Sequence, residues 1–175
     1  MAKRRDLRGS KPWRGKSTRR RREGPRSRDD HGLAPYRRAA PTLAPADFAH
    51  KWQGVTTTER ASAQAQFIDI CRMLGEPTPH EADPAGEWYA FEKGAEKLGG
   101  GDGFADVWKR GHFAWEYKGK RKDLKAAYRQ LNDDREDLDN PPLLVVSDLD
   151  RFEVHTNFTG TPSRAYRFTL ADISS

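Results

Sequence analysis

The sequence has little of several residue types and patterns, and each shortage excludes a class of protein to which the chain could belong. A single cysteine, Cys71, cannot form a bridge within the chain, so a disulfide-stapled secreted fold is excluded. No stretch approaches the roughly 18 apolar residues of a membrane-spanning helix, and the N-terminus lacks the apolar segment of a secretory signal. We therefore expect a cytoplasmic protein without membrane contact, in which Cys71 is an ordinary buried thiol within an apolar helical pattern.

Aliphatic side chains are almost missing from the first forty residues, which are instead strongly basic. They contain 15 Lys/Arg against 4 Asp/Glu, whereas residues 41–175 contain 17 against 22, so the net charge of +6 comes from the tail. Such a segment cannot bury enough apolar surface to offset the entropy of ordering it, and we expect residues 1–43 to be disordered. Its run Arg19, Arg20, Arg21 and Arg22 is a candidate for electrostatic DNA binding. A solvated extension and an upstream start codon explain it equally well.

Residues 44–175 alternate helical and strand-like patterns. The expected elements are helices at 45–52 and 56–74, a polar loop at 77–86, strands at 88–92, 105–109 and 112–118, a helix at 124–138, and strands at 143–146, 152–156 and 165–170. Thr56 and Glu59 form a capping box at the start of the second helix. This order predicts an α/β fold, a mixed sheet flanked by helices.

The hairpin at residues 103–118, GFADVWKRGHFAWEYK, holds the candidate site. Its turn brings Asp106 close to Glu116, and Lys118 follows two positions later on the same strand face. His112, Ala114, Glu116 and Lys118 are expected to face a cleft, and Phe113, Trp115 and Tyr117 to face the core. Two carboxylates, helped by the backbone carbonyl of Tyr117, suit Mg²⁺ or Mn²⁺ beside a phosphodiester.

The same spacing has an alternative interpretation as a solvated strand face. One third of the chain is charged, and a second carboxylate-x-lysine pair occurs at Asp123 and Lys125. Spacing alone favours the solvated strand face, and the hairpin with its flanking helices brings the two interpretations to equal weight.

Three segments resemble a known family: GGGDGFADVWKRGHFAWEYKGK at 99–120, DNPPLLVVSDLDR at 139–151 and HTNF at 155–158. They are similar to the N-terminal nuclease region of MmeI-like enzymes, which join a PD-(D/E)XK endonuclease to an adenine-specific DNA methyltransferase. The resemblance begins near Ala44 and covers the rest of the chain. It implies a restriction-endonuclease-like fold for residues 44–175.

The resemblance also implies roles for individual residues. Asp106 and Glu116 match the family's metal carboxylates and Lys118 its catalytic lysine, while Ala105 replaces the proline of the motif name. Supporting positions facing the site or lining its cleft would be Glu59, Gln66, Tyr128 and Gln130.

What the resemblance implies for partners is double-stranded DNA, Mg²⁺ or Mn²⁺, and a separate methyltransferase or specificity chain. The family's methyltransferase and target-recognition domains are missing from this sequence, so we expect a truncated or split family member in which S-adenosylmethionine would act only through the missing region or that partner. Two other interpretations stay open: a non-catalytic DNA-binding remnant acting through its basic tail, and a structural accessory of a methyltransferase.

Overall fold

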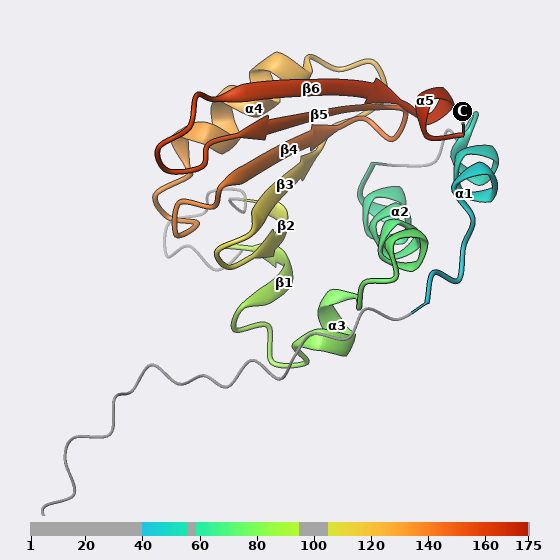
Figure 1. Cartoon of the computed structure of the whole chain (residues 1–175), viewed down its shortest axis with the longest axis horizontal. Helices are drawn as coiled ribbons and strands as arrows, with labels where there is room; N and C mark the ends of the chain where they lie inside the picture. Colours follow the sequence, from blue (N-terminus) through green and yellow to red (C-terminus); the bar gives the residue numbers. More distant parts are fainter. Residues whose placement is uncertain (1–39, 56–58, 95–104, 175) are drawn as a thin grey trace, which may run out of the picture. The chain divides into compact units, whose positions relative to one another are not determined.

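The structure is a computed structural model that describes residues 40–55, 59–94 and 105–174. Its elements are α1 Pro45–Trp52, α2 Glu59–Leu74, α3 Pro79–Ala82, β1 Tyr89–Lys93, β2 Ala105–Lys109, β3 Phe113–Tyr117, α4 Leu124–Asp133, β4 Leu143–Ser147, β5 Arg151–Thr156, β6 Arg164–Thr169 and α5 Leu170–Ile173 (Figure 1). The basic tail and the capping residue Thr56 lie outside the described residues, as do the side chain of Glu59 and most of the glycine-rich loop before β2. In the described part, no helix is long and apolar enough to cross a membrane.

The six strands form one sheet in chain order, β1 to β6. Neighbouring strands are antiparallel except β3 and β4, which are parallel and are connected through α4. A parallel pair needs such a crossover because its second strand must start again at the same edge as the first. The mixed sheet expected from the sequence is therefore confirmed.

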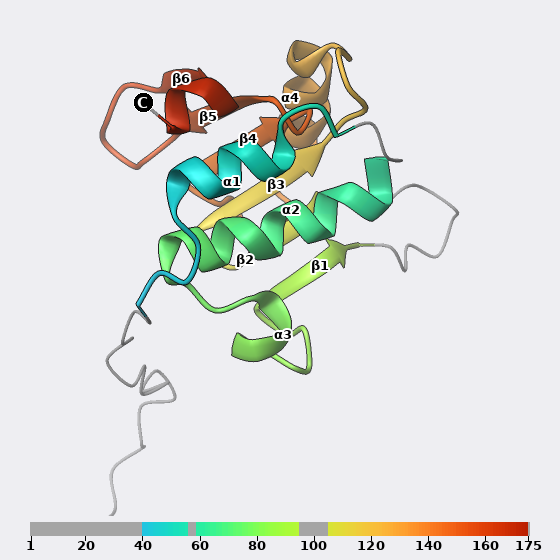
Figure 2. The ribbon, with the colours of Figure 1, turned by 90° about the vertical axis from the view of Figure 1, so that its right-hand side faces the viewer.

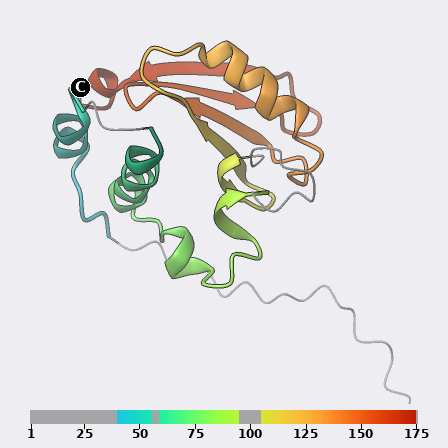
Figure 3. The same ribbon diagram turned by 180° about the vertical axis from the view of Figure 1, so that it is seen from behind.

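Helices cover both faces of the sheet. Figure 2 shows α1 and α2 lying across one face, and Figure 3 shows α4 on the opposite one. The core under α2 is aromatic, with Phe67 within 5.4 to 6.4 Å of four ring centroids. Those four rings belong to Tyr89, Phe91, Phe113 and Trp115. The expected inward face of the hairpin is thus correct for Phe113, Trp115 and Tyr117, which all belong to this core.

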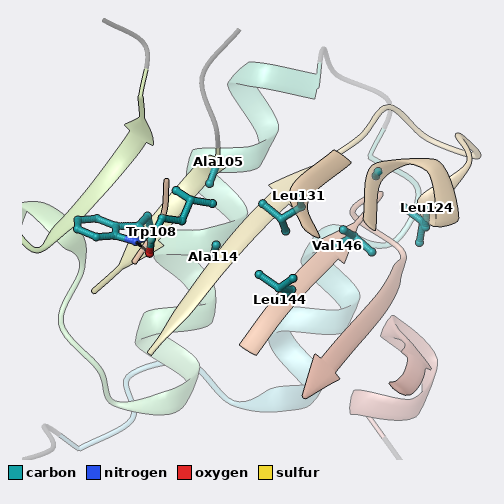
Figure 4. Close-up of a cluster of buried hydrophobic side chains, with 9 residues drawn as sticks. Ala105, Trp108, Ala114, Leu124, Leu131, Leu144 and Val146 are labelled. Carbon is teal, nitrogen blue, oxygen red and sulfur yellow. Dashed lines mark hydrogen bonds between the residues drawn. The ribbon is translucent and has the colours of Figure 1, made fainter. Parts of the chain in front are cut away.

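The core under α4 is built from smaller side chains and one tryptophan (Figure 4). Its buried members are Ala105, Trp108, Ala114, Leu124, Ala127, Leu131, Leu138, Leu144 and Val146. Trp108 is fully buried and donates its indole N–H to the carbonyl of Leu138 at 2.9 Å. This bond fixes the segment after α4 against the hairpin.

Three expectations about element boundaries were wrong. The loop at 77–86 contains α3, which begins with a capping box between Thr78 and Glu81. Helix α4 ends at Asp133 rather than at Leu138, because the chain turns there, although Leu138 remains buried. Leu170 begins α5 instead of ending β6, since its buried side chain packs with α1.

Candidate active site

The β2–β3 hairpin brings the two candidate carboxylates to the same end of its ladder. The antiparallel register ends with Val107 paired to Trp115, and Asp106 and Glu116 are the next residues beyond that pair. Asp106 also lines a small space beside α2. The hairpin therefore places the two acids at the same edge of the sheet.

Asp106 is fixed by the backbone of the neighbouring strand. Its Oδ2 atom accepts a hydrogen bond from the Tyr117 N–H at 2.6 Å. The Tyr117 side chain itself lies in the aromatic core, where burial, then the charge of Asp106, raise the pKa of its phenol well above the ordinary value. Tyr117 thus remains neutral, and its Oη atom has no hydrogen-bond partner among the described residues.

Glu116 and Lys118 form a close, partly shielded ion pair. The Lys118 Nζ atom donates to Glu116 Oε1 at 2.7 Å, and the two side chains are 27% and 13% exposed. Alternation along β3 places both on the α4 face, and the pair is reachable from solvent. The ammonium group is positioned within hydrogen-bond distance of a carboxylate that would hold a metal.

The expected outward face of β3 is only partly open. Ala114 was expected to face a cleft, but it is fully buried in the core under α4. Exposure begins two residues later, at Glu116, where β3 approaches its end. The open part of this face is therefore confined to the end of β3.

The oxygen donors at this edge fit a hard divalent cation. Asp106 and Glu116 offer carboxylates, and Mg²⁺ needs only one or two of these because substrate phosphate and water complete its shell. Among the described residues, no group of three or more His, Cys, Asp or Glu side chains is arranged to hold a metal alone. The site thus suits a metal shared with an oxyanion substrate rather than a closed structural metal centre.

A family model described as MmeI, N-terminal domain, matches residues 43–174. The chain belongs to this family. Membership of the MmeI N-terminal domain family indicates a function related to restriction and modification. No curated protein and no solved structure matches the chain.

The structure places three of the supporting residues suggested by the resemblance, Gln66, Tyr128 and Gln130, while the side chain of Glu59 lies outside the described residues. Gln66 is fully buried on the α2 side, where its amide donates to the Leu149 carbonyl at 2.8 Å, so the sheet separates it from the Glu116 face. Tyr128 stacks on His155 with ring centroids 3.6 Å apart, and Gln130 is exposed. In this MmeI N-terminal domain, Gln66 therefore packs on the opposite side of the sheet from Glu116, whereas Tyr128 packs on the core under α4.

Two acidic residues near the site were missed by the sequence analysis. Glu92 lies opposite Asp106 by the β1–β2 register, has a positive φ of 54° and accepts from Gln64 on α2 at 3.2 Å. Asp148 follows β4 and binds the loop after Lys118. The only sequence signal for Asp148 was its position directly after a strand expected to be buried, and the parallel pairing of β3 and β4 places that strand end beside the hairpin.

A separate groove of about 520 Å³ lies between the second half of α2 and the starts of β3 and β4. It is lined largely by apolar side chains, among them Phe67, Leu74, Val145 and Phe158. It holds neither Asp106 nor Glu116 and therefore does not coincide with the candidate site.

Proposed function

We propose that this chain is a metal-dependent endonuclease domain of a restriction-modification protein, which hydrolyses phosphodiesters of double-stranded DNA. The observation that carries the proposal is the position of Asp106 and Glu116 just beyond the end of the β2–β3 ladder, with the Lys118 ammonium 2.7 Å from Glu116. Family membership supplies the restriction-modification context.

In this proposal, Asp106, Glu116 and the Tyr117 carbonyl hold Mg²⁺ or Mn²⁺. When bound, such a cation polarises the scissile phosphate and lowers the pKa of a bound water. The hydrogen bond from the Tyr117 N–H fixes the orientation of the Asp106 carboxylate. Lys118 holds the attacking water or offsets charge developing on the phosphate.

We also assign the fold to the restriction-endonuclease-like class. Support comes from the order helix, three antiparallel strands, helix and parallel strand, with the acidic pair on the central hairpin. Sequence specificity, and any use of S-adenosylmethionine, would belong to a methyltransferase region or partner chain.

Nicking of supercoiled plasmid with Mg²⁺ or Mn²⁺ tests the proposal. The parent should nick, Lys118→Ala should lose activity by at least about 100-fold, and Lys125→Ala should keep it. Lys125 is the matched control because it stands in the chain's other carboxylate-x-lysine pair, where Asp123 only caps α4. Nicking that survives in Lys118→Ala would refute the assignment.

The rival proposal, a non-catalytic DNA-binding remnant, predicts a different pattern. Neither metal would support nicking, and deletion of residues 1–40, which include Arg19, Arg20, Arg21 and Arg22, would abolish DNA binding. An accessory of a methyltransferase would instead co-purify with that partner and show no cleavage of its own.

A further inference from the structure

The segment after β3 is a short, strongly basic loop. Residues 118–122 read KGKRK, and the side chains of Lys120, Arg121 and Lys122 are exposed. These three make no ion pair with any residue that the structure describes. A protein that leaves three cations unneutralised on five residues has a surface suited to polyanions.

The loop is nevertheless held at several backbone positions. Lys118 N–H donates to the Ser147 carbonyl at 2.8 Å, and Lys122 N–H donates to the Gly119 carbonyl at 3.0 Å. Arg121 adopts a positive φ of 64°, a conformation uncommon for a residue with a side chain. Such a backbone persists only where its surroundings fix it.

Asp148 and Arg151 supply that fixation from the turn after β4. Asp148 is 1% exposed, and its Oδ2 atom accepts from the Arg121 N–H at 3.0 Å. Arg151 donates Nη2 to the same oxygen at 2.6 Å and to the Lys122 carbonyl at 3.0 Å. One ion pair therefore fixes two consecutive residues of the basic loop.

The ion pair between Asp148 and Arg151, which holds the basic loop, is charged at neutral pH. Burial by itself would raise the pKa of Asp148, but hydrogen bonds from the Arg151 side chain and from backbone N–H groups outweigh it and lower the pKa. The carboxylate is thus ionised at neutral pH. Its acceptor positions are occupied within the protein, so Asp148 is a structural acid and no metal ligand.

The sheet topology places this basic loop beside the paired acids. Strands β3 and β4 are parallel, with Tyr117 paired to Ser147, so both end at the same edge of the sheet. The loop leaves β3 directly after Glu116 and Tyr117, and Asp148 leaves β4 at the same level. The exposed cations Lys120, Arg121 and Lys122 therefore follow β3 at the same edge of the sheet as Glu116.

We propose that residues 118–122 form a preorganised contact for the DNA phosphate backbone flanking the scissile bond, and that Asp148 and Arg151 are positioning residues that hold it. This inference rests on the proposed function for its substrate. A loop already ordered loses less conformational entropy on binding than a free one. Asp148 and Arg151 thereby hold three surface cations in a fixed arrangement that can contact DNA phosphates.

Salt-dependent binding of a 20-base-pair duplex to the full chain tests the contact, measured by fluorescence anisotropy without divalent metal. The loop variant carries Lys120→Ala, Arg121→Ala and Lys122→Ala. A matched variant loses the same charge at exposed Arg110, Arg129 and Arg164, which lie on other elements.

Each phosphate contact contributes about 0.9 to the slope of log K against log salt. The loop variant should therefore lose about 2 to 3 units of slope, which makes its loss of affinity between 50 and 200 mM salt about 40-fold smaller. The matched variant should lose less than about 1 unit. Equal changes in both would overturn the proposal, because only net charge would then matter.

Hydrogen exchange and epistasis test the positioning role. Arg151→Ala should speed exchange of the Arg121 amide selectively and reduce the salt slope. Arg151→Lys, which can still pair with Asp148, should restore part of both. Added to the loop variant, Arg151→Ala should change the slope no further, and an additive loss would show that Arg151 acts on DNA directly.

The outcomes separate this inference from the proposed nuclease activity. A slope difference without any nicking would retain the loop contact and refute catalysis. If the parent nicks DNA but the loop and matched variants have identical salt slopes, the catalytic proposal is retained and the loop contact is refuted.

Discussion

Replacing Lys118 with methionine should strengthen metal binding while abolishing cleavage. The Lys118 Nζ atom lies 2.7 Å from Glu116 Oε1, so a cation held by the same carboxylate would feel the ammonium at about 5 Å. Charges of +2 and +1 at this separation repel by about 1.7 kcal/mol even at the dielectric constant of water. Removing the ammonium should therefore lower the Mn²⁺ dissociation constant roughly 20-fold.

Isothermal titration of Mn²⁺ into the metal-free protein, without DNA, measures this change. Lys125→Met is the control, since it removes the same charge next to the helix cap of Asp123 and should alter the affinity by less than about threefold. An unchanged or weakened affinity in Lys118→Met would refute the reasoning. It would mean that Glu116 does not bind the cation, or that Lys118 leaves the carboxylate before the metal arrives.

Three further measurements test the structure around the site. Burial raises the pKa of Cys71 from 9.0 to about 11, so iodoacetamide at pH 8 should alkylate the native chain at least about 100-fold more slowly than the urea-unfolded chain. Equal rates would mean an open thiol. Trp108→Phe leaves the Leu138 carbonyl without its donor and should lower the free energy of unfolding in urea by about 1 to 3 kcal/mol; an unchanged midpoint would show that the bond contributes nothing. Although burial opposes it, hydrogen bonding lowers the pKa of Asp148, so its contribution to stability is complete above the unfolded pKa, about 4, and is lost as pH falls through the lower folded value. Asp148→Asn should therefore weaken the acid dependence of the melting temperature, and parallel pH profiles would contradict this assignment.

The hairpin could be predicted from the sequence because its determinants are local. The turn at Gly111 and the period-two alternation of Phe113, Trp115 and Tyr117 specify which side chains share a face. Once that face is buried under α2, the opposite placement of Glu116 follows without knowledge of the rest of the sheet. The two candidate carboxylates were accessible to sequence reasoning for the same reason.

Features that depend on distant partners could not be predicted in this way. Helix α4 stops at Asp133 although Leu138 continues its apolar spacing, because Leu138 reaches the core from a turn and its carbonyl binds Trp108. The burial of Gln66 depends on a carbonyl 83 residues away. The clamp from Asp148 to Arg121 likewise joins two loops whose proximity follows only from the parallel pairing of β3 and β4.

Glu116 and Lys118 lie at the end of β3, beyond the part of the sheet that is buried under α4. This position predicts that the ion pair serves the function of the site without stabilising the fold. Ala114 lies opposite Leu144 deep in the core under α4, whereas Glu116, two residues on, is 13% exposed in its ion pair with Lys118. Partly buried ion pairs often stabilise a fold no more than apolar residues of equal size.

Glu116→Leu combined with Lys118→Met should therefore leave the melting temperature unchanged or raise it, by up to about 2 kcal/mol of stability. The same variant should lose Mn²⁺ binding, because one of the paired acids is gone. A clear destabilisation would mean that the pair maintains the sheet edge by itself. Retained stability with lost metal binding would show that these charges serve the chemistry of the site and not the fold.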